Sequence, residues 1–381
     1  MARRFGSPRP SGNQPSHSSQ AHGNQVFQPL PNPTGSAPFR LALDSILSPH
    51  RISTIQHAGK IVFHIAGDVG GIQDPTPQLI VARKLVNQLY VNESDRPAFF
   101  YIAGDVVYFN GQTSGYFPQF YQAYEHYNAP IFAVPGNHDG DPGHTGETSL
   151  SAFFRNFCSH SPVLTHEAGE VERDAMTQPN CYFTLNAPFV TIVGLYSNVP
   201  EGGQIHQDQI DWLVNELREA PRNKALLVVV HHPAFSFDDH HSGSTHIRDV
   251  LDDAFERSGR IADAVITGHV HNYQRFTRTI NGRQVPYLVV GAGGYHHLHS
   301  MRKGSDGRDL QVPLSVPSHQ LVLEDYADDR HGFMRITVDA NRVVGEYFTV
   351  PRRHESWRAE ARKYDSFALD WVNGSLVPHS T

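Results

Sequence analysis

The chain has 381 residues, of which 39% are hydrophobic and 18% charged, a composition typical of a globular protein with a sizeable core. Its net charge of −7 argues against a nucleic-acid partner, and no apolar run approaches the roughly 20 residues that a membrane span requires. Cys158 and Cys181 lack zinc-type spacing; they could pair with each other, but we expect two free, buried thiols.

Residues 1–39 differ in composition from the rest of the chain. They are rich in Ser, Pro, Gly, Asn and Gln and poor in core-forming residues, so we expect disorder. No apolar segment of a secretory signal follows Arg3 and Arg4, and the prolines argue against an amphipathic transit helix. We therefore expect a cytoplasmic protein with a tail at 1–39, one folded domain at 40–355 and an extension of uncertain structure at 356–381.

From residue 60 onward, short apolar runs alternate with longer amphipathic stretches. The apolar runs predict strands within residues 60–68, 97–105, 129–139, 181–197 (two strands), 224–233 and 262–271. Helical spacing predicts helices at 76–91, 115–127, 209–220 and 245–258. Hairpins are predicted over 273–290, around Asn281-Gly282, and over 332–350. This order predicts an α/β fold in which two mixed β-sheets pack as a sandwich flanked by helices.

Polar side chains directly follow five of the predicted strands. They are Asp68 in AGDVGG, Asp105 and Tyr108 in GDVVY, Asn137, His138 and Asp139 in GNHD, His231 in VVVHHP, and His269 and His271 in GHVH. Ligands of open α/β sheets bind beyond the carboxyl ends of the strands, so we expect these groups to converge. Each motif alone also fits a turn, a capping loop or a surface histidine, whereas the set favours a metal site.

The number of ligands indicates two metal ions. The side chains suited to coordination are Asp68, Asp105, Tyr108, Asn137, His231, His269 and His271. These are too many for one ion and suit two ions bridged by a carboxylate. Two-metal sites of this kind catalyse in-line displacement at phosphorus.

The motifs and their order resemble those of the purple acid phosphatases, a branch of the calcineurin-like metallophosphoesterases. That pattern reads GDxG, GDxxY, GNH followed by an acid, VxxH and GHxH, and this chain matches it at residues 67–70, 104–108, 136–139, 228–231 and 268–271. Most of the superfamily begins with DxH, whereas Asp68-Val69-Gly70 lacks that histidine and Tyr108 resembles the replacement ligand of the purple branch. A phenolate is a hard anionic donor that favours ferric iron.

The resemblance implies the αββα architecture of metallophosphoesterases and assigns the ligands to two ions. The first ion, Fe(III), would be held by Asp68, Asp105, Tyr108 and His271. The second, which could be Fe, Zn or Mn, would be held by Asp105, Asn137, His231 and His269, with Asp105 bridging the two ions.

The resemblance also implies roles for further histidines. His138 resembles the histidine that faces the phosphate and the leaving group, and Asp139 would orient it. His240 and His241 stand at the spacing of a substrate-facing pair, although a solvated loop would also account for them. Additional rim candidates are His296, His297 and His299, and Gln274 stands where the plant motif usually has Glu.

The implied function is hydrolysis of phosphate monoesters, by in-line attack of a metal-bound hydroxide on a small phosphorylated substrate. A phosphodiesterase with the same metal centre is the first alternative. The missing DxH histidine argues against the cyclic-nucleotide branch, and the acidic charge argues against polymeric nucleic acid. A non-catalytic binding protein on the same fold is the second alternative, and the presence of every ligand argues against it.

Overall fold

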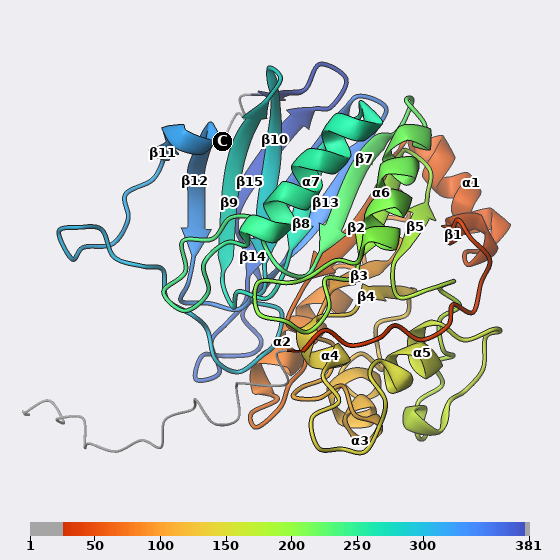
Figure 1. Ribbon diagram of the computed structural model, residues 1–381. Helices are drawn as coiled ribbons and strands as arrows, with labels where there is room; N and C mark the ends of the chain where they lie inside the picture. Colours follow the sequence, from red (N-terminus) through yellow and green to blue (C-terminus); the bar gives the residue numbers. More distant parts are fainter. Residues whose placement is uncertain (1–25, 378–381) are drawn as a thin grey trace, which may run out of the picture.

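The computed structural model describes residues 26–377, which form two β-sheets packed face to face (Figure 1). The α-helices are α1 Pro49–Ala58, α2 Thr76–Asn87, α3 Thr113–Tyr116, α4 Asn137–Gly140, α5 Ser151–Phe157, α6 Gln207–Glu219 and α7 Thr245–Ser258. The strands are β1 Arg40–Ala42, β2 Lys60–Ala66, β3 Phe100–Ala103, β4 Ile131–Val134, β5 Phe183–Asn186, β6 Val190–Leu195, β7 Ala225–Val230, β8 Ala264–Thr267, β9 Tyr273–Ile280, β10 Arg283–Val290, β11 Leu314–Val316, β12 Leu321–Ala327, β13 Gly332–Asp339, β14 Arg342–Thr349, β15 Arg362–Asp370 and β16 Ser375–Val377.

Both sheets mix parallel and antiparallel strands. The nine-stranded sheet has the order β1-β5-β6-β7-β8-β10-β9-β12-β11, and the seven-stranded sheet has the order β16-β15-β14-β13-β2-β3-β4. Strands β2, β3 and β4 run parallel to one another, as do β6, β7 and β8. The predicted hairpins form as β9–β10 and β13–β14, both antiparallel. The predicted fold class, two mixed sheets with flanking helices, is confirmed.

The central strands are buried on both faces, which explains their continuous apolar runs. All six residues of β7, ALLVVV, are buried. Aromatic rings join the two sheets across the interior: Tyr101 of β3 stacks on Phe183 of β5, with ring centroids 6.3 Å apart. Tyr273 of β9 likewise stacks on Tyr347 of β14, with centroids 3.8 Å apart. The core between the sheets therefore fixes how their ends align.

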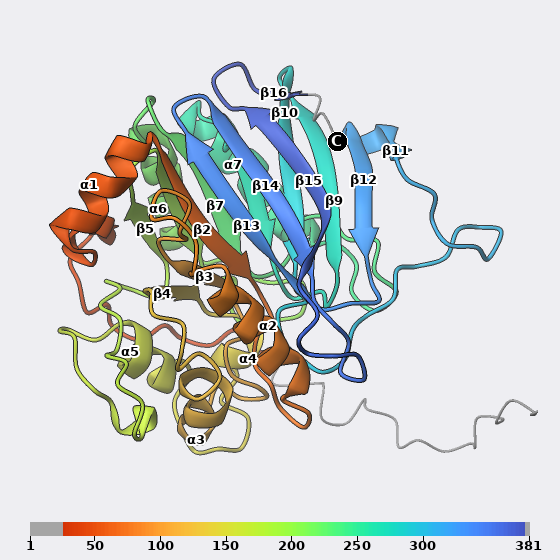
Figure 2. The same cartoon turned by 180° about the vertical axis from the view of Figure 1, so that it is seen from behind.

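Amphipathic helices cover the outer faces. Figure 1 shows α6 and α7 over the nine-stranded sheet, and Figure 2 shows α2 on the side of the seven-stranded sheet. Helix α7 begins at a Ser244 cap, whose hydroxyl accepts from the Ile247 amide, and ends at Gly259 in the left-handed region. The helix predicted at 115–127 is instead divided into α3 and a π-helical turn over Phe117–Tyr121.

The chain ends contribute more structure than their composition indicates. Residues 26–39 belong to the segment expected to be disordered, but the Thr34 amide donates to the Pro179 carbonyl at 3.1 Å and Gln28 bonds with Asn198. Residues 362–377, assigned to an extension of uncertain structure, form β15 and β16 at one edge of the seven-stranded sheet. The remainder of the predicted tail, residues 1–25, and residues 378–381 lie outside the described range.

Two further sequence expectations concern cysteines and membrane segments. Cys158 and Cys181 are both buried and both free thiols. Among residues 26–377, no helix is both long enough and apolar enough to cross a membrane.

Candidate metal centre

The predicted ligands meet where parallel strands of both sheets end. Asp68, Asp105 and Asn137 follow β2, β3 and β4, which lie side by side in one sheet. His231 and His269 follow the neighbouring strands β7 and β8 of the other sheet. Figure 1 shows α4, which begins at Asn137, just beyond the ends of β3 and β4. The expected convergence is therefore present, and it spans the edges of two sheets.

The backbone at these strand ends is strained and tightly packed. Asp68, Asp105 and His269 have φ angles of 57°, 56° and 67°, in the left-handed region that non-glycine residues seldom adopt. The glycine of GNHD allows a close approach, because a Cβ at Gly136 would lie 2.0 Å from Asp105 Oδ1. A Cβ at Gly104 would lie 2.2 Å from His231 Nδ1. These glycines let the ligands of neighbouring strands approach one another.

One group of donors is built around Tyr108. The phenol oxygen lies 3.2 Å from Asp68 Oδ1 and 3.3 Å from His271 Nε2, and these last two atoms are 3.4 Å apart. Gln119 holds the tyrosine backbone in place through both its amide and its carbonyl. The other ring nitrogen of His271, Nδ1, lies 3.0 Å from the His297 carbonyl, to which it donates when Nε2 carries the lone pair.

A second group is built around Asn137. Its Oδ1 lies 3.1 Å from His231 Nε2 and 3.1 Å from His269 Nδ1. His231 Nε2 is also 3.4 Å from Asp105 Oδ2. The carbonyl of Ala103, 2.9 Å from His231 Nδ1, can accept a proton there and leave Nε2 free to bind a metal.

These separations fit donors that share an ion. Two donors each about 2.1 Å from one ion are about 3.0 Å apart at a right angle and about 3.4 Å apart at the tetrahedral angle. The donor–donor distances in both groups fall between 3.1 and 3.4 Å. Asp68, Asp105 and His231 also lie within the range of a common ion. The residues therefore fit a binuclear metal centre.

The pKa shifts of the buried groups at this site indicate that it favours positive charge. Burial raises the pKa of the Asp68 carboxyl well above its usual range; His231 opposes this effect and the nearby Asp105 carboxylate adds to it. Burial, Asp105 and Asp68 together raise the pKa of the Tyr108 phenol well above its usual range. Burial lowers the pKa of His231, but Asp105 and Asp68 outweigh it and raise the value to about 9. Bound cations would reverse the shifts of the acidic groups.

His138 lies beside the donors, but Asp139 does not orient it. His138 Nδ1 is 2.8 Å from the Phe109 carbonyl, and its ring packs on Tyr108 with centroids 4.6 Å apart. The Asp139 carboxylate instead accepts from the amides of Val106, Val107 and Gly136 at 2.9–3.1 Å. Both residues belong to the helical turn α4, where consecutive side chains point about 100° apart. The expected orienting contact is wrong for this reason.

His240 and His241 lie at the rim of the centre. The His241 ring packs against the predicted ligand His269, with centroids 4.6 Å apart. His240 stacks on His299, whose ring centroid lies 4.2 Å from that of the predicted ligand His271. His297 contributes its carbonyl, as described above, while Tyr295 packs on both Tyr108 and His271.

Two acids at this rim were missed by sequence reasoning. Glu201 Oε1 lies 3.0 Å from His241 Nδ1 and 3.6 Å from His269 Nε2. Asp238 accepts from the amides of His240 and His241, both at 2.9 Å, and pairs with His299. Both stand in loops without a motif; the one available signal was that Asp238 comes two residues before the histidine pair.

Gln274, noted as a departure from the plant motif, holds the same loop. Its Oε1 accepts from the Phe237 amide at 2.8 Å, and its Nε2 donates to Ser236 Oγ and Asn272 Oδ1. A glutamine supplies both the acceptor and the donor that this position requires.

A sandwich of two mixed sheets with donors for two ions at the strand ends defines a dimetal phosphoesterase fold. A profile of the calcineurin-like phosphoesterases matches residues 61–273, more than half of the chain, and the chain belongs to that family. Purple acid phosphatase 21 of Arabidopsis thaliana is 33% identical over 202 residues, which are 51% of this chain and 40% of that protein. The chain thus spans less than half the length of this relative.

Solved structures support the fold. The purple acid phosphatase PPD1 from yellow lupin (Lupinus luteus) seeds superposes with a TM-score of 0.59 at 16% identity, covering 84% of this chain and 57% of that one. GAP50, described as the anchor in the inner membrane complex of Plasmodium, superposes with a TM-score of 0.52 at 16% identity, covering 80% and 88% of the two chains.

Proposed function

We propose that the protein hydrolyses phosphate monoesters of small molecules at a two-metal centre. The observation that carries this proposal is the pair of donor groups, each with separations of 3.1–3.4 Å, assembled from the ends of both sheets. The similarity to purple acid phosphatase 21 supports the choice of monoesters. Two ions held there would bind phosphoryl oxygens and lower the pKa of a coordinated water from about 15.7 towards 7.

The residues around the centre have distinct tasks in this proposal. His138, anchored through Nδ1 to the Phe109 carbonyl, presents Nε2 to the substrate and gives its proton to the departing alkoxide. His241, anchored through Nδ1 to Glu201, hydrogen-bonds to a phosphate oxygen. Asp238 fixes the backbone of both rim histidines, so that their rings stay in position beside the bound phosphate.

We propose Fe(III) as the ion at Tyr108 on the basis of donor chemistry. A carboxylate, a phenolate and an imidazole form a hard, anionic set that suits Fe(III), with Fe, Zn or Mn at the Asn137 site. The visible spectrum of the oxidised protein, with metal analysis of the same sample, tests this: a tyrosinate bound to ferric iron absorbs in the visible. We expect the band to vanish in Tyr108→Phe and to persist in the matched control Tyr295→Phe, whose ring centroid lies 4.4 Å from that of Tyr108. A colourless protein with two zinc ions would remove the ferric assignment and leave the phosphoesterase one.

Substrate class is tested separately, with nitrophenyl phosphate and bis-nitrophenyl phosphate as paired substrates. We expect kcat/KM to be higher for the monoester, because the imidazoles of His138 and His241 would hydrogen-bond to its dianionic phosphate. A higher value for the diester would replace this proposal with a phosphodiesterase. No turnover of either substrate by protein with both sites filled would favour a binding role.

A further inference from the structure

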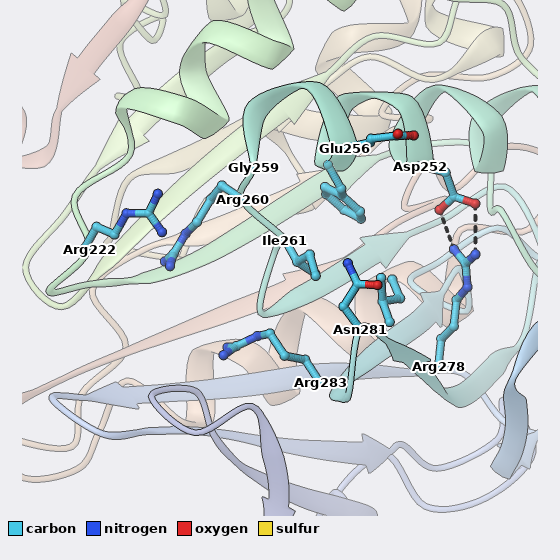
Figure 3. A pocket seen from close by; sticks show the side chains of 11 residues that line it. Arg222, Asp252, Glu256, Gly259, Arg260, Ile261, Arg278, Asn281 and Arg283 are labelled. Carbon is cyan, nitrogen blue, oxygen red and sulfur yellow. Dashed lines mark hydrogen bonds and ion pairs between the residues drawn. The ribbon is translucent and has the colours of Figure 1, made fainter.

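A second charged site lies at the opposite end of the nine-stranded sheet, where strands β7 and β8 begin. A cavity of about 570 Å³ is bordered by the loop before β7, the second half of α7, the loop before β8 and the β9–β10 hairpin (Figure 3). Strands β7 and β8 start at this end of the sheet, and His231 and His269 follow their opposite ends. Since a six-residue strand spans about 20 Å, the cavity is well separated from the metal centre.

Four arginines line this cavity: Arg222, Arg260, Arg278 and Arg283. Arg278 is neutralised by Asp252, which accepts two hydrogen bonds from it at 2.5 and 2.8 Å. Arg283 donates to Asp263 Oδ1 at 2.9 Å and to the Trp371 carbonyl at 2.7 Å. These two guanidiniums are therefore largely satisfied by the protein.

The other two arginines are not matched in this way. The Nε and Nη2 atoms of Arg260 are buried without a hydrogen-bond partner, and its carboxylate neighbour, Asp263 Oδ2, is 3.8 Å from Nη2. That oxygen already accepts from the Leu226 amide at 2.8 Å. Arg222 is exposed and forms no ion pair with any residue in the range 26–377. Buried donors left without an acceptor cost about 1–3 kcal/mol, so the Arg260 charge lacks a compensating partner. Because Nε and Nη2 are closed to solvent, a molecule in the cavity would reach this guanidinium through its remaining nitrogen, Nη1.

Local negative charge does not supply that partner. The carbonyl end of α7 carries partial negative charge that favours nearby arginines, but it accepts no hydrogen bond from Arg260 Nε or Nη2. Glu256, on the same helix, is exposed at the cavity border. Burial lowers the pKa of Arg260; Asp263 opposes this, while Arg222 and Arg283 lower the pKa further, so the three cations repel one another.

We propose that this cavity binds a phosphate-bearing small molecule. Arg222 and Arg260 would contact the phosphate groups, and Arg283 would add positive charge nearby. The half-buried Ile261 and Ile280 would pack on the organic part. Figure 3 shows Arg222 and Arg260 from different loops beside each other, with Arg283 below them on the hairpin. Guanidiniums that approach from two loops suit a tetrahedral oxyanion with several acceptors, whereas a planar carboxylate binds with both oxygens to a single guanidinium. The inference does not depend on the proposed hydrolysis.

Calorimetric titration of the metal-loaded protein with methylenebisphosphonate, which is not hydrolysed, tests the proposal. We expect two binding events, one at the metal centre and one at the cavity. Arg260→Gln and the exposed Arg222→Gln should each weaken the second event about tenfold or more and leave kcat/KM for nitrophenyl phosphate unchanged. The matched control is Arg308→Gln, an exposed arginine on another loop, which should leave both events intact.

Three results would overturn the proposal. One is a single binding event that persists in Arg260→Gln and Arg222→Gln but is lost in Asn137→Ala, which would place all binding at the metal centre. A second is equal weakening by Arg308→Gln, which would reduce the effect to net charge. The third is full retention of both events in the two cavity variants. Thermal unfolding of each variant establishes that the comparison is made on folded protein.

Discussion

Asp139→Asn preserves the shape of a buried side chain while turning one of its two acceptor oxygens into a donor. In the native protein, Oδ1 accepts from the amides of Val106 and Val107, and Oδ2 accepts from Val106 and Gly136. If the asparagine oxygen keeps the first pair, its amide group faces the Gly136 N–H. The loop after β3 and the turn after β4 then lose the carboxylate that joins them.

The expected loss of stability can be worked from these contacts. One buried N–H left without an acceptor costs about 1–3 kcal/mol. Burial raises the pKa of Asp139 to about 7, so above that pH the change from charged to neutral acceptor weakens the remaining bonds by about 1 kcal/mol. A total of about 2–4 kcal/mol corresponds to a fall in Tm of about 3–5 °C, given an unfolding entropy of about 2.1 cal/mol/K per residue over about 350 residues. Metal affinity should fall as well, because both loops carry ligands.

The assay compares Asp139→Asn with His138→Ala by thermal unfolding, metal analysis and kcat per filled site. We expect Asp139→Asn to lower Tm and metal content while kcat per filled site stays within a few-fold of the native value. His138→Ala should show the reverse pattern, with kcat reduced by about 10²–10⁴ and Tm and metal content unchanged. A loss of kcat in Asp139→Asn as large as that in His138→Ala, at full metal content and native Tm, would refute the structural role.

Three further predictions concern Gly136 and Gln274 near the site and His64 within β2. Gly136→Ala should abolish metal binding, because a Cβ at Gly136 would lie 2.0 Å from Asp105 Oδ1. Gly146→Ala, in a loop with open space, should retain metal. Native metal content in Gly136→Ala would contradict this prediction. Gln274→Glu should lower Tm more at pH 8 than at pH 5, since only the protonated acid can donate towards Ser236 and Asn272; an equal effect at both pH values would exclude the donor role. Burial lowers the pKa of His64 to about 3, so the folded state resists protonation of this residue. The free energy of unfolding that it contributes is fully present above pH 6.5. It is lost as the pH falls towards 3, at about 1.4 kcal/mol per pH unit. His64→Gln should flatten that part of the acid unfolding curve, and an unchanged slope would show that other groups cause it.

The parts of the fold that could be predicted are those with a local signal. Strand β7 is a continuous apolar run that stops at His231, so one stretch of sequence indicates both the strand and the ligand. Strand β15, RKYDSFALD, has no such signal, because its charges suggest an exposed segment. Its Asp365 is buried only through Arg275 and Tyr273, which lie about 90 residues earlier. The charge is compensated in space, and nothing in the local pattern reveals it.

The same distinction applies to the site. Residues that follow a strand after glycine, such as Asp105 and Asn137, could be identified because their position follows from the strand itself. Glu201 and Asp238 could not, since their loops are placed by tertiary contacts with His241, His269 and His299. Asp139 was identified but given the wrong contact, because adjacency in sequence does not mean adjacency of side chains on a helical turn.

The division of the donors between two sheets has a thermodynamic consequence. An ion shared by Asp105 after β3 and His231 after β7 would cross-link two layers that also meet through side-chain packing and a few hydrogen bonds, such as that from Tyr273 to Asp365. Binding to the folded state at a free metal concentration 1,000 times Kd adds about 4.1 kcal/mol to the free energy of unfolding. The free metal concentration therefore affects the stability of the contact between the two sheets. Chelation should therefore accelerate hydrogen exchange first at Gly67. The amide of Gly67 bonds to the Val290 carbonyl in the other sheet, so an early loss of protection there would mark the separation of the sheets.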